Sequence, residues 1–109
     1  MGLVRQIQII IESARKQGKN PSLVGTDLSG VNLRGVDLSA VNLSEAKLFG
    51  ADMRNTNLHE ANLSKADLRY ANMFGADLSD ADLGGANLQK TNLEKVNLSG
   101  AIMPDSFGI

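Results

Sequence analysis

The sequence predicts an all-β solenoid, a rod of stacked coils, and three periodic features predict it. Leucine or methionine occupies every fifth position from Leu23 to Met103, with fourteen leucines and three methionines at seventeen positions. From Thr26 to Ala101 the position two residues before each centre holds only Ala, Val or Thr, and the position between them is Asp or Asn in fourteen of sixteen cases. A period of five fits neither a helix nor a flat strand, so the backbone must turn by a fixed angle every five residues to keep each leucine inside.

Each repeat has five positions, illustrated by the segment Ala76-Asp77-Leu78-Ser79-Asp80. In order, they are the small position, the Asp/Asn position, the central position, and the first and second variable positions. Central side chains form the core, and a small residue beside them lets the corners of the coil approach closely. The variable positions hold many residue types, so we expect them to face solvent. Asn, Asp, Ser and Gly recur where turns need side-chain hydrogen bonds or a positive φ.

A capping helix and a linker are predicted for residues 1–20. A solenoid exposes unpaired backbone and apolar side chains at its ends, so it needs caps. Gly18 and Pro21 are expected to end the helix. A membrane or a protein partner is an alternative target for such a basic amphipathic helix, but Ile9 points away from the main apolar face, which favours the cap. That face contains Leu3, Ile7, Ile10, Ile11 and Ala14, with Val4 at its edge.

The repeats occupy residues 21–103, and residues 104–109 form a C-terminal tail. This tail is too short for a long capping helix. Four residues near it are apolar, namely Ile102, Met103, Phe107 and Ile109. They either fold over the last coil or form a dimer interface, and we expect a homodimer through Ile102, Phe107 and Ile109.

Charge and composition exclude several classes of protein. Residues 1–20 carry four bases and one acid, a net +3, and residues 21–109 carry seven bases and eleven acids, a net −4. Neither value demands a nucleic-acid or membrane partner. The sequence has no cysteine, so it has no disulfide and no thiolate metal site, which fits a reducing compartment. The apolar stretch from Ile9 to Ile11 is far shorter than the roughly 20 residues of a membrane span. We therefore expect a cytoplasmic protein.

Several segments resemble the pentapeptide-repeat family, whose motif is A(D/N)LXX. They include Ala-Asp-Leu-Ser-Asp at 76–80, Ala-Asn-Leu-Ser-Lys at 61–65 and Val-Asp-Leu-Ser-Ala at 36–40, and the match covers about 80 of the 109 residues. The resemblance implies a right-handed quadrilateral β-helix, of bacterial type, with four repeats or 20 residues per coil and about four coils. The sequence itself shows no 20-residue superperiod, so the four-sided coil is an expectation from the resemblance alone.

The resemblance also implies an alternative function. Certain members of the family resemble a DNA duplex in shape and charge and regulate type II topoisomerases. Duplex DNA carries one negative charge per ~1.7 Å, so a rod of about 19 Å would need about eleven net negative charges. Residues 21–109 have a net charge of −4. Five bases interrupt any acidic stripe, namely Arg34, Arg54, Arg69, Lys90 and Lys95. Charge therefore disfavours mimicry.

An enzyme or a metal-binding protein is a further alternative that the sequence disfavours. The single histidine, His59, stands beside Glu60, and a catalytic role would need a nucleophile and an orienting carboxylate from neighbouring coils. Asp77, Asp80 and Asp82 suggest a cation site, but they lack the spacing of a calcium loop. A straight rod filled with leucine does not provide a substrate pocket. We expect no catalytic residue, no metal and no cofactor.

The variable positions suggest a surface for a protein partner. With the four-sided coil that the resemblance implies, Arg34, Arg54 and Phe74 would form one outward column, and Phe49 and Tyr70 would fall on the adjoining side near Arg69. Aromatic residues and arginine are enriched among the anchors of protein interfaces. The candidate partner-binding residues are Phe49, Arg54, Arg69, Tyr70 and Phe74. The alternative is that the aromatic residues lie on the surface by chance or pack on their neighbours. The sequence thus favours a non-catalytic scaffold that presents a rigid rod to a protein partner of unknown identity.

Overall fold

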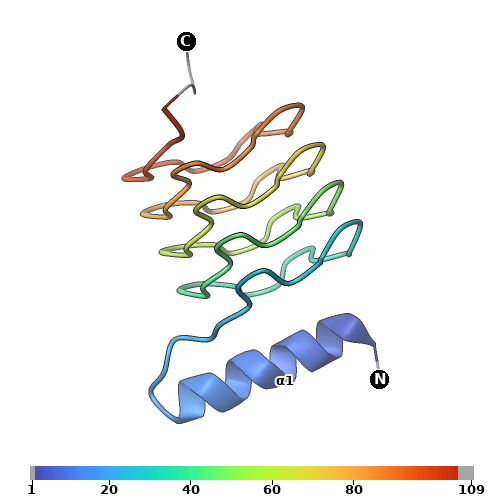
Figure 1. Cartoon of the computed structure of the whole chain (residues 1–109), viewed down its shortest axis with the longest axis vertical. Coiled ribbons are helices and arrows are strands. Elements are labelled where there is room, and N and C mark those ends of the chain that lie inside the picture. The colour runs from blue at the N-terminus through green and yellow to red at the C-terminus, as the bar shows by residue number, and fades with distance from the viewer. Residues whose placement is uncertain (1, 106–109) are drawn as a thin grey trace.

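The computed structural model describes residues 2–105, and it contains one helix and a rod of stacked coils (Figure 1). Helix α1 spans Leu3–Lys16 and lies across one end of the rod. The chain then winds away from the helix, coil upon coil, toward the opposite end. The molecule measures 41 × 25 × 23 Å.

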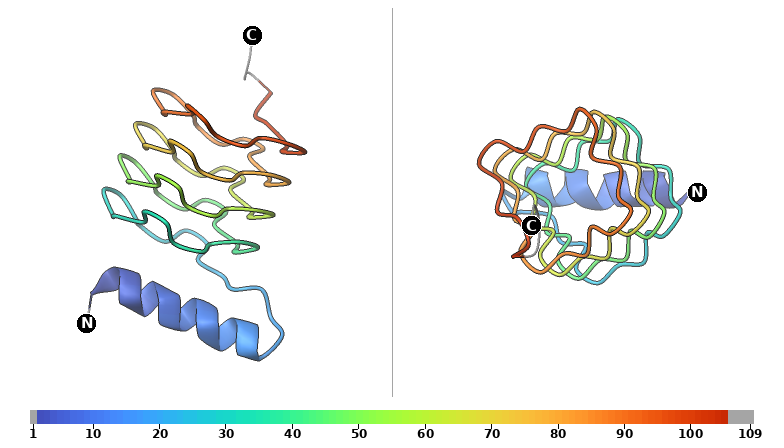
Figure 2. Two further views of the ribbon diagram at one scale, coloured as in Figure 1. Left: turned by 180° about the vertical axis from the view of Figure 1, so that it is seen from behind. Right: turned by 90° about the horizontal axis from the view of Figure 1, so that it is seen from above.

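Parallel bridges hold the coils together, and each bridge joins two residues that are 20 positions apart, from residue 22 to residue 102. Two hydrogen bonds illustrate the pattern. The N–H of Leu28 donates to the carbonyl of Lys47 at 2.7 Å, and the N–H of Lys47 donates to the carbonyl of Thr26 at 2.9 Å. Twenty residues therefore make one coil with four five-residue sides, as the resemblance implies, and Figure 2 shows the four-sided outline. Within residues 2–105 these single-residue bridges make up the β structure, without a longer strand.

The central positions face inward and form one core. Every central side chain from Leu28 to Leu83 is fully buried, and the alanines beside them are buried as well. Thr56 is the buried polar residue of this core, and its hydroxyl donates to the carbonyl of Leu33 at 2.7 Å, so it has a partner. Toward the end of the repeats the packing loosens, and Leu98 is only half-buried. The core predicted from the five-residue period is confirmed.

Two features of the repeat build each corner of a coil. The N–H at the small position donates to the preceding central carbonyl, as from Ala66 to Leu63 at 3.0 Å. The Asp/Asn side chain accepts from the N–H two residues on, as from Ser64 to Asn62 at 2.9 Å. Asp and Asn share this acceptor oxygen, which explains why the repeat uses either of them. The second variable position has φ between +57° and +72°, whether or not it holds glycine.

Two glycines at the second variable position can test how closely consecutive coils approach at a corner. A methyl group on Gly75 would fall against the side-chain oxygen of Asn55 in the preceding coil, whereas one on Gly50 would meet no atom. Gly50→Ala should cost about 1–2 kcal/mol of unfolding free energy through its positive φ alone. Gly75→Ala should cost about 1 kcal/mol more, because it also crowds Asn55. Urea unfolding measures both, and Asn55→Gly should remove the difference. If Gly50→Ala and Gly75→Ala cost the same in a protein that keeps Asn55, the side chain of Asn55 moves aside freely.

Helix α1 ends as expected and covers the first coil. Gly18 has a φ of +69°, and the N–H of Lys19 donates to the carbonyl of Ala14 at 3.0 Å, which closes the helix in a Schellman motif. Ile7 and Ile11 are buried under the rod. Hydrogen bonds from Arg15 attach the last turn to the first coil at residues 37 and 39. The predicted N-terminal helix is therefore confirmed and lies where a cap must lie.

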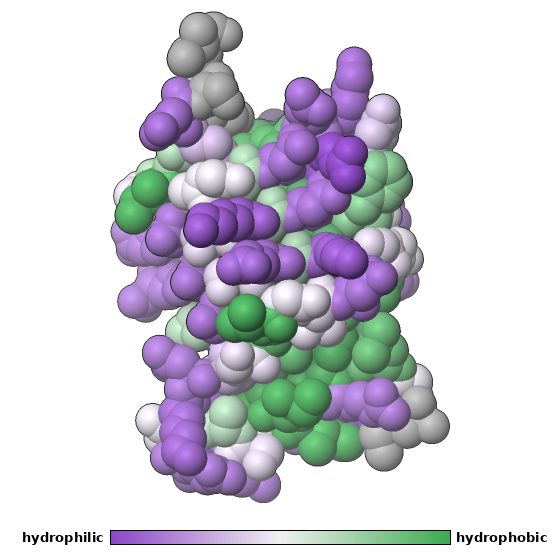
Figure 3. Space-filling view, viewed as in Figure 1, coloured by the Kyte–Doolittle hydropathy of each residue, from purple (hydrophilic) through white to green (hydrophobic). Residues whose placement is uncertain are grey.

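Two residues of the helix differ from the prediction. Leu3 and Ile10 were expected on the buried face, but they are 44% and 47% exposed. A helix that lies on the end of a coil makes contact along a narrow line, here through Ile7 and Ile11, so residues on its flank stay uncovered. Figure 3 shows the hydrophobic residues that gather over α1 and the first coil. In the described part of the chain, no helix has the length and apolar character needed to cross a membrane.

The predicted homodimer contact involves residues at the far end of the rod. Ile102 is 60% exposed and bridges to Asp82. Phe107 and Ile109 lie outside the described residues. The dimer through these three residues therefore stays a prediction.

Candidate functional site

Three of the five candidate residues come together on one side of the rod, which consists of residues 26–30, 46–50, 66–70 and 86–90. Phe49 and Arg69 are one coil apart, so they occupy the same column, and the guanidinium of Arg69 lies 5.2 Å from the centroid of the Phe49 ring. The rings of Phe49 and Tyr70 are tilted by 54° with centroids 5.3 Å apart. Cation–π and tilted aromatic contacts of this kind are favourable. We call Phe49, Arg69 and Tyr70 the aromatic cluster.

The backbone of Tyr70 has the positive φ of the second variable position, which eight other non-glycine residues share. Its φ is +62°, in the left-handed region that favours glycine, and the two earlier residues of the same column are Gly30 and Gly50. A non-glycine residue in this conformation costs about 1–2 kcal/mol. The side chain of Tyr70 is nevertheless 59% exposed, so it contributes little to the core.

Each arginine among the candidates is bound by an aspartate two residues earlier. Nε and Nη2 of Arg69 donate to the two carboxylate oxygens of Asp67 at 2.9 and 2.7 Å. Arg54 and Asp52 form the same bidentate pair at 2.9 and 2.7 Å. Sequence reasoning missed the two aspartates, although the spacing Asp-x-Arg, with both residues pointing outward, was a signal that could have found them.

The other two candidates lie on the adjoining side, which consists of residues 31–35, 51–55, 71–75 and 91–95. Arg54 and Phe74 are likewise one coil apart and share a column, and Phe74 is 38% exposed. Among residues 2–105, the ring contact between Phe49 and Tyr70 is the one aromatic pair, so Phe74 does not stack on the aromatic cluster. The five residues thus form a cluster of three and a neighbouring column of two.

The single histidine lies on a different side, and the structure does bring a hydroxyl and a carboxylate to it. Nδ1 of His59 lies 2.8 Å from the Ser79 hydroxyl, and Nε2 lies 3.0 Å from Glu60. The Ser79 hydroxyl donates its hydrogen to Asp77 at 2.6 Å, so His59 is not placed to accept that proton. The arrangement is a polar contact between consecutive coils. Within residues 2–105, no three His, Asp or Glu side chains are close enough to bind a metal ion.

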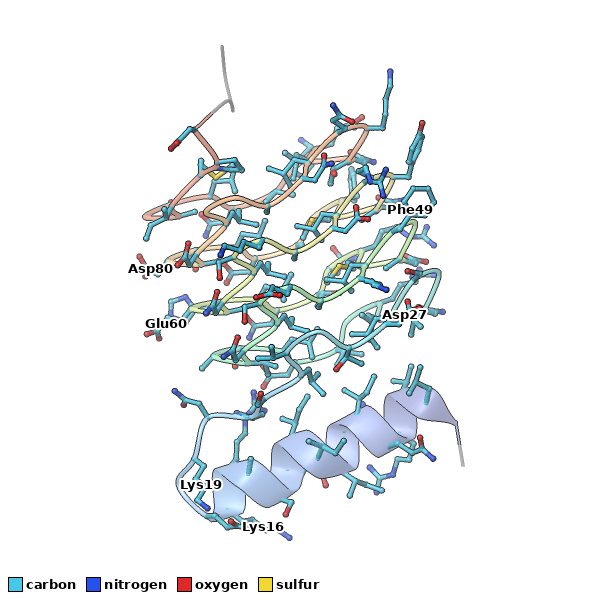
Figure 4. The ribbon with its side chains drawn as sticks, viewed as in Figure 1. Lys16, Lys19, Asp27, Phe49, Glu60 and Asp80 are labelled. Atoms are coloured by element: carbon cyan, nitrogen blue, oxygen red, sulfur yellow. The ribbon has the colours of Figure 1, made fainter. Side chains whose placement is uncertain are left out.

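Charge is distributed unequally around residues 21–100. The two sides with the candidate residues carry six bases and four acids, a net +2, whereas the other two sides carry one base and six acids, a net −5. Figure 4 shows Phe49 at one edge of the rod and Glu60 and Asp80 at the opposite edge. The aromatic cluster is therefore turned away from the acidic half of the surface.

Five aspartates at Asp/Asn positions have a lowered pKa. Hydrogen bonds from arginine side chains hold the pKa of Asp52 and Asp67 below the ordinary 3.8. The hydroxyl of the serine two residues on does the same for the pKa of Asp37 and Asp77, and a backbone N–H does so for the pKa of Asp27. A carboxyl with a depressed pKa in the folded state stabilises the fold above its unfolded pKa, and this stabilisation is lost as pH falls through the folded pKa.

We therefore predict that stability falls as the pH drops below about 4. A matched control replaces all five aspartates with asparagine, which occupies the same position in other repeats and keeps the acceptor oxygen. This variant should fold, and it should lose less stability than the wild type between about pH 5 and about pH 2. Urea unfolding across this range measures the difference. If the two proteins lose the same unfolding free energy over this pH range, the lowered pKa values of the five aspartates are wrong.

Comparison with known proteins gives matches along the whole repeat region. A family model described as pentapeptide repeats matches residues 19–48, 37–80 and 76–106 in eight copies. A pentapeptide repeat protein from the cyanobacterium Cyanothece 51142 is 36% identical with a TM-score of 0.74, over 75% of this chain and 56% of that chain. No curated protein matches this chain significantly.

Two further solved structures come from the cyanobacterium Nostoc PCC 7120. HetL, described as involved in the regulation of heterocyst differentiation, is 42% identical with a TM-score of 0.72, over 73% of this chain and 37% of that chain. Another pentapeptide repeat protein is 33% identical with a TM-score of 0.51, over 93% of this chain and 87% of that chain. The present chain thus spans about half of the Cyanothece protein and less than half of HetL.

These matches agree with the fold and indicate no catalytic family. Pentapeptide repeat proteins fold as right-handed quadrilateral β-helices, which is the architecture that the resemblance implied. The repeat motif, the 20-residue coil and the family match over residues 19–106 all lead to the same conclusion. This chain belongs to the pentapeptide-repeat family.

Proposed function

We propose that this protein is a non-catalytic interaction scaffold that presents the aromatic cluster, on a rigid rod, to a protein partner. One observation carries the proposal: the ring of Tyr70, which is 59% exposed, lies against the ring of Phe49, which is 42% exposed, with centroids 5.3 Å apart. The turn does not need the ring, because Gly30 and Gly50 form the same turn in earlier coils. Tyrosine and arginine are enriched among the anchors of protein interfaces.

The neighbouring column enlarges the proposed surface. Arg54 and Phe74 lie on the adjoining side, and an interface of standard size covers about 800 Å² on each partner. All three aromatic residues of the two sides are exposed by more than a third. The absence of cysteine from the sequence is compatible with action in the cytoplasm, which we include in the proposal.

Mimicry of duplex DNA, with a type II topoisomerase as partner, has less support. A mimic needs negative charge along its faces, whereas the two sides with the aromatic residues carry a net +2. The acidic half of the rod carries a net −5, about half of what its length requires.

Site-specific cross-linking tests the scaffold proposal. A photoreactive phenylalanine in place of Tyr70 should give a covalent adduct of discrete mass with one protein in the source cell. The same group in place of Ser99, an exposed residue on the acidic half, is the matched control and should give no such adduct. Identical adducts from both positions, or none from position 70, would contradict the proposal.

A further inference from the structure

The geometry points to a specific kind of partner: a protein segment with an apolar or aromatic anchor side chain flanked by carboxylates. This inference rests on the proposed docking role of the aromatic cluster and adds the chemistry of what docks there. It follows from three features of the surface, namely arginines that are already paired, rings that are uncovered, and unpaired bases around them.

Aspartates already neutralise the two arginines at the centre of the surface. Arg69 uses Nε and Nη2 on Asp67, and one face of its guanidinium lies over the Phe49 ring. Arg54 is held by Asp52 through the same two nitrogens. Each guanidinium keeps N–H donors on Nη1, but its aspartate neutralises its charge, so a carboxylate or phosphate from a partner meets a neutral ion pair rather than a free cation. Toward a partner, the centre of the surface is therefore electrically neutral.

The uncovered rings define what the centre does offer. Tyr70 is 59% exposed and Phe49 is 42% exposed, and their rings are tilted rather than parallel. Burial of apolar area and ring stacking are the interactions that such a pair provides. An aromatic side chain gains both and an aliphatic side chain gains the burial, whereas a carboxylate at the centre loses hydration without finding a counter-charge.

Unpaired bases surround this neutral centre. Outside the two Asp–Arg pairs, the same two sides of the rod carry four bases and two acids, a net +2. Lys47 precedes Phe49 by two residues, Lys90 follows Tyr70 by one coil, and Arg34 precedes Arg54 by one coil. All three bases are exposed, and no salt bridge within residues 2–105 includes them. Charges at the rim of an interface steer association, so this rim favours carboxylates beside the anchor.

The same features argue against a nucleic-acid ligand. A protein that neutralises six or more phosphates loses about 10³-fold or more in affinity between about 50 mM and about 200 mM salt. Here two arginines at the centre are already neutralised, and four other bases remain on the two sides of the rod. An apolar anchor should make the affinity only weakly dependent on salt.

The experiment is selection from a phage-displayed library of random linear peptides on the immobilised full chain. Two variants serve as counter-selections. Tyr70→Gly removes the ring at a position where the repeat already uses glycine. The double variant Lys47→Glu and Lys90→Glu reverses the charge of two bases at the rim of the surface. We expect selected peptides to contain Trp, Phe, Tyr or Leu next to Asp or Glu. Their affinity should fall about 30-fold or more on Tyr70→Gly. The rim variant should weaken it about tenfold, mainly through the association rate.

The possible outcomes separate this inference from the docking role itself. Selected peptides that depend on Tyr70 but carry basic residues beside the anchor, or lack an apolar anchor, would overturn the inferred chemistry of the partner. They would still support the proposed docking surface. A loss of affinity of about 10³-fold between about 50 mM and about 200 mM salt would also overturn it, in favour of a charge-driven ligand. If no peptide is enriched, or if the enriched peptides bind Tyr70→Gly as well as the wild type, both the inference and the proposed function are wrong.

Discussion

Replacing Leu68 with alanine should lower the free energy of unfolding by about 2–5 kcal/mol. Leu68 is a central residue in the middle of the rod and has no exposed surface. Its removal loses the transfer free energy of the side chain and leaves a cavity that neighbouring coils cannot fill, because the bridges above and below fix their backbone. Urea unfolding followed by far-ultraviolet circular dichroism measures the loss.

Leu98→Ala is the matched control for this prediction. Leu98 occupies the same position of the repeat, but it is only half-buried in the last coil. Its replacement should therefore cost clearly less than that of Leu68. Equal costs at the two sites would show that burial inside the coil does not determine the stability of the rod.

The second large effect concerns the cap. Ile11→Asp places a carboxylate at a residue that is 3% exposed between the helix and the first coil. Burial of an unpaired charge is strongly unfavourable, so the helix should detach from the rod, and stability should fall by about 3 kcal/mol or more. The uncovered first coil then exposes apolar side chains and unpaired backbone, which should cause self-association that increases with concentration.

Ile10→Asp is the control because it makes the same chemical change one residue away, at a position 47% exposed. It should leave both stability and the sedimentation coefficient close to those of the wild type. If Ile10→Asp causes self-association and Ile11→Asp does not, then the helix packs through its other flank and the described cap is wrong.

The core could be predicted from the sequence because the period of five leaves one arrangement for the leucines. The coil length could not, because every side of the coil uses the same repeat and nothing in the residues marks where the fourth side ends. The resemblance supplied the value of 20, and the bridges confirm it. On the helix, a wheel assigns Leu3 and Ile10 to the apolar face, but it cannot tell how wide a strip the coil end covers. The structure leaves both residues exposed.

Part of the candidate site could likewise be predicted from the sequence, and part of it could not. The contact between Phe49 and Arg69 follows from their positions in the sequence once the coil length is known, because they then occupy the same place in consecutive coils. The tilt of Tyr70 onto Phe49 depends on a positive φ and on a side-chain rotamer, which the repeat pattern does not specify. The pairing of Arg69 with Asp67 was visible as a spacing of two residues, and it makes the centre of the surface neutral rather than basic.

The most direct test of the docking surface is a parallel measurement on Tyr70→Gly: its affinity for the cross-linked partner or a selected peptide, and its melting temperature. We predict that affinity falls about 30-fold or more, because the ring is an anchor. The melting temperature should stay the same or rise, because glycine adopts the positive φ without strain. A variant that binds like the wild type but melts at a lower temperature would contradict the account, since Tyr70 would then support the rod rather than a partner.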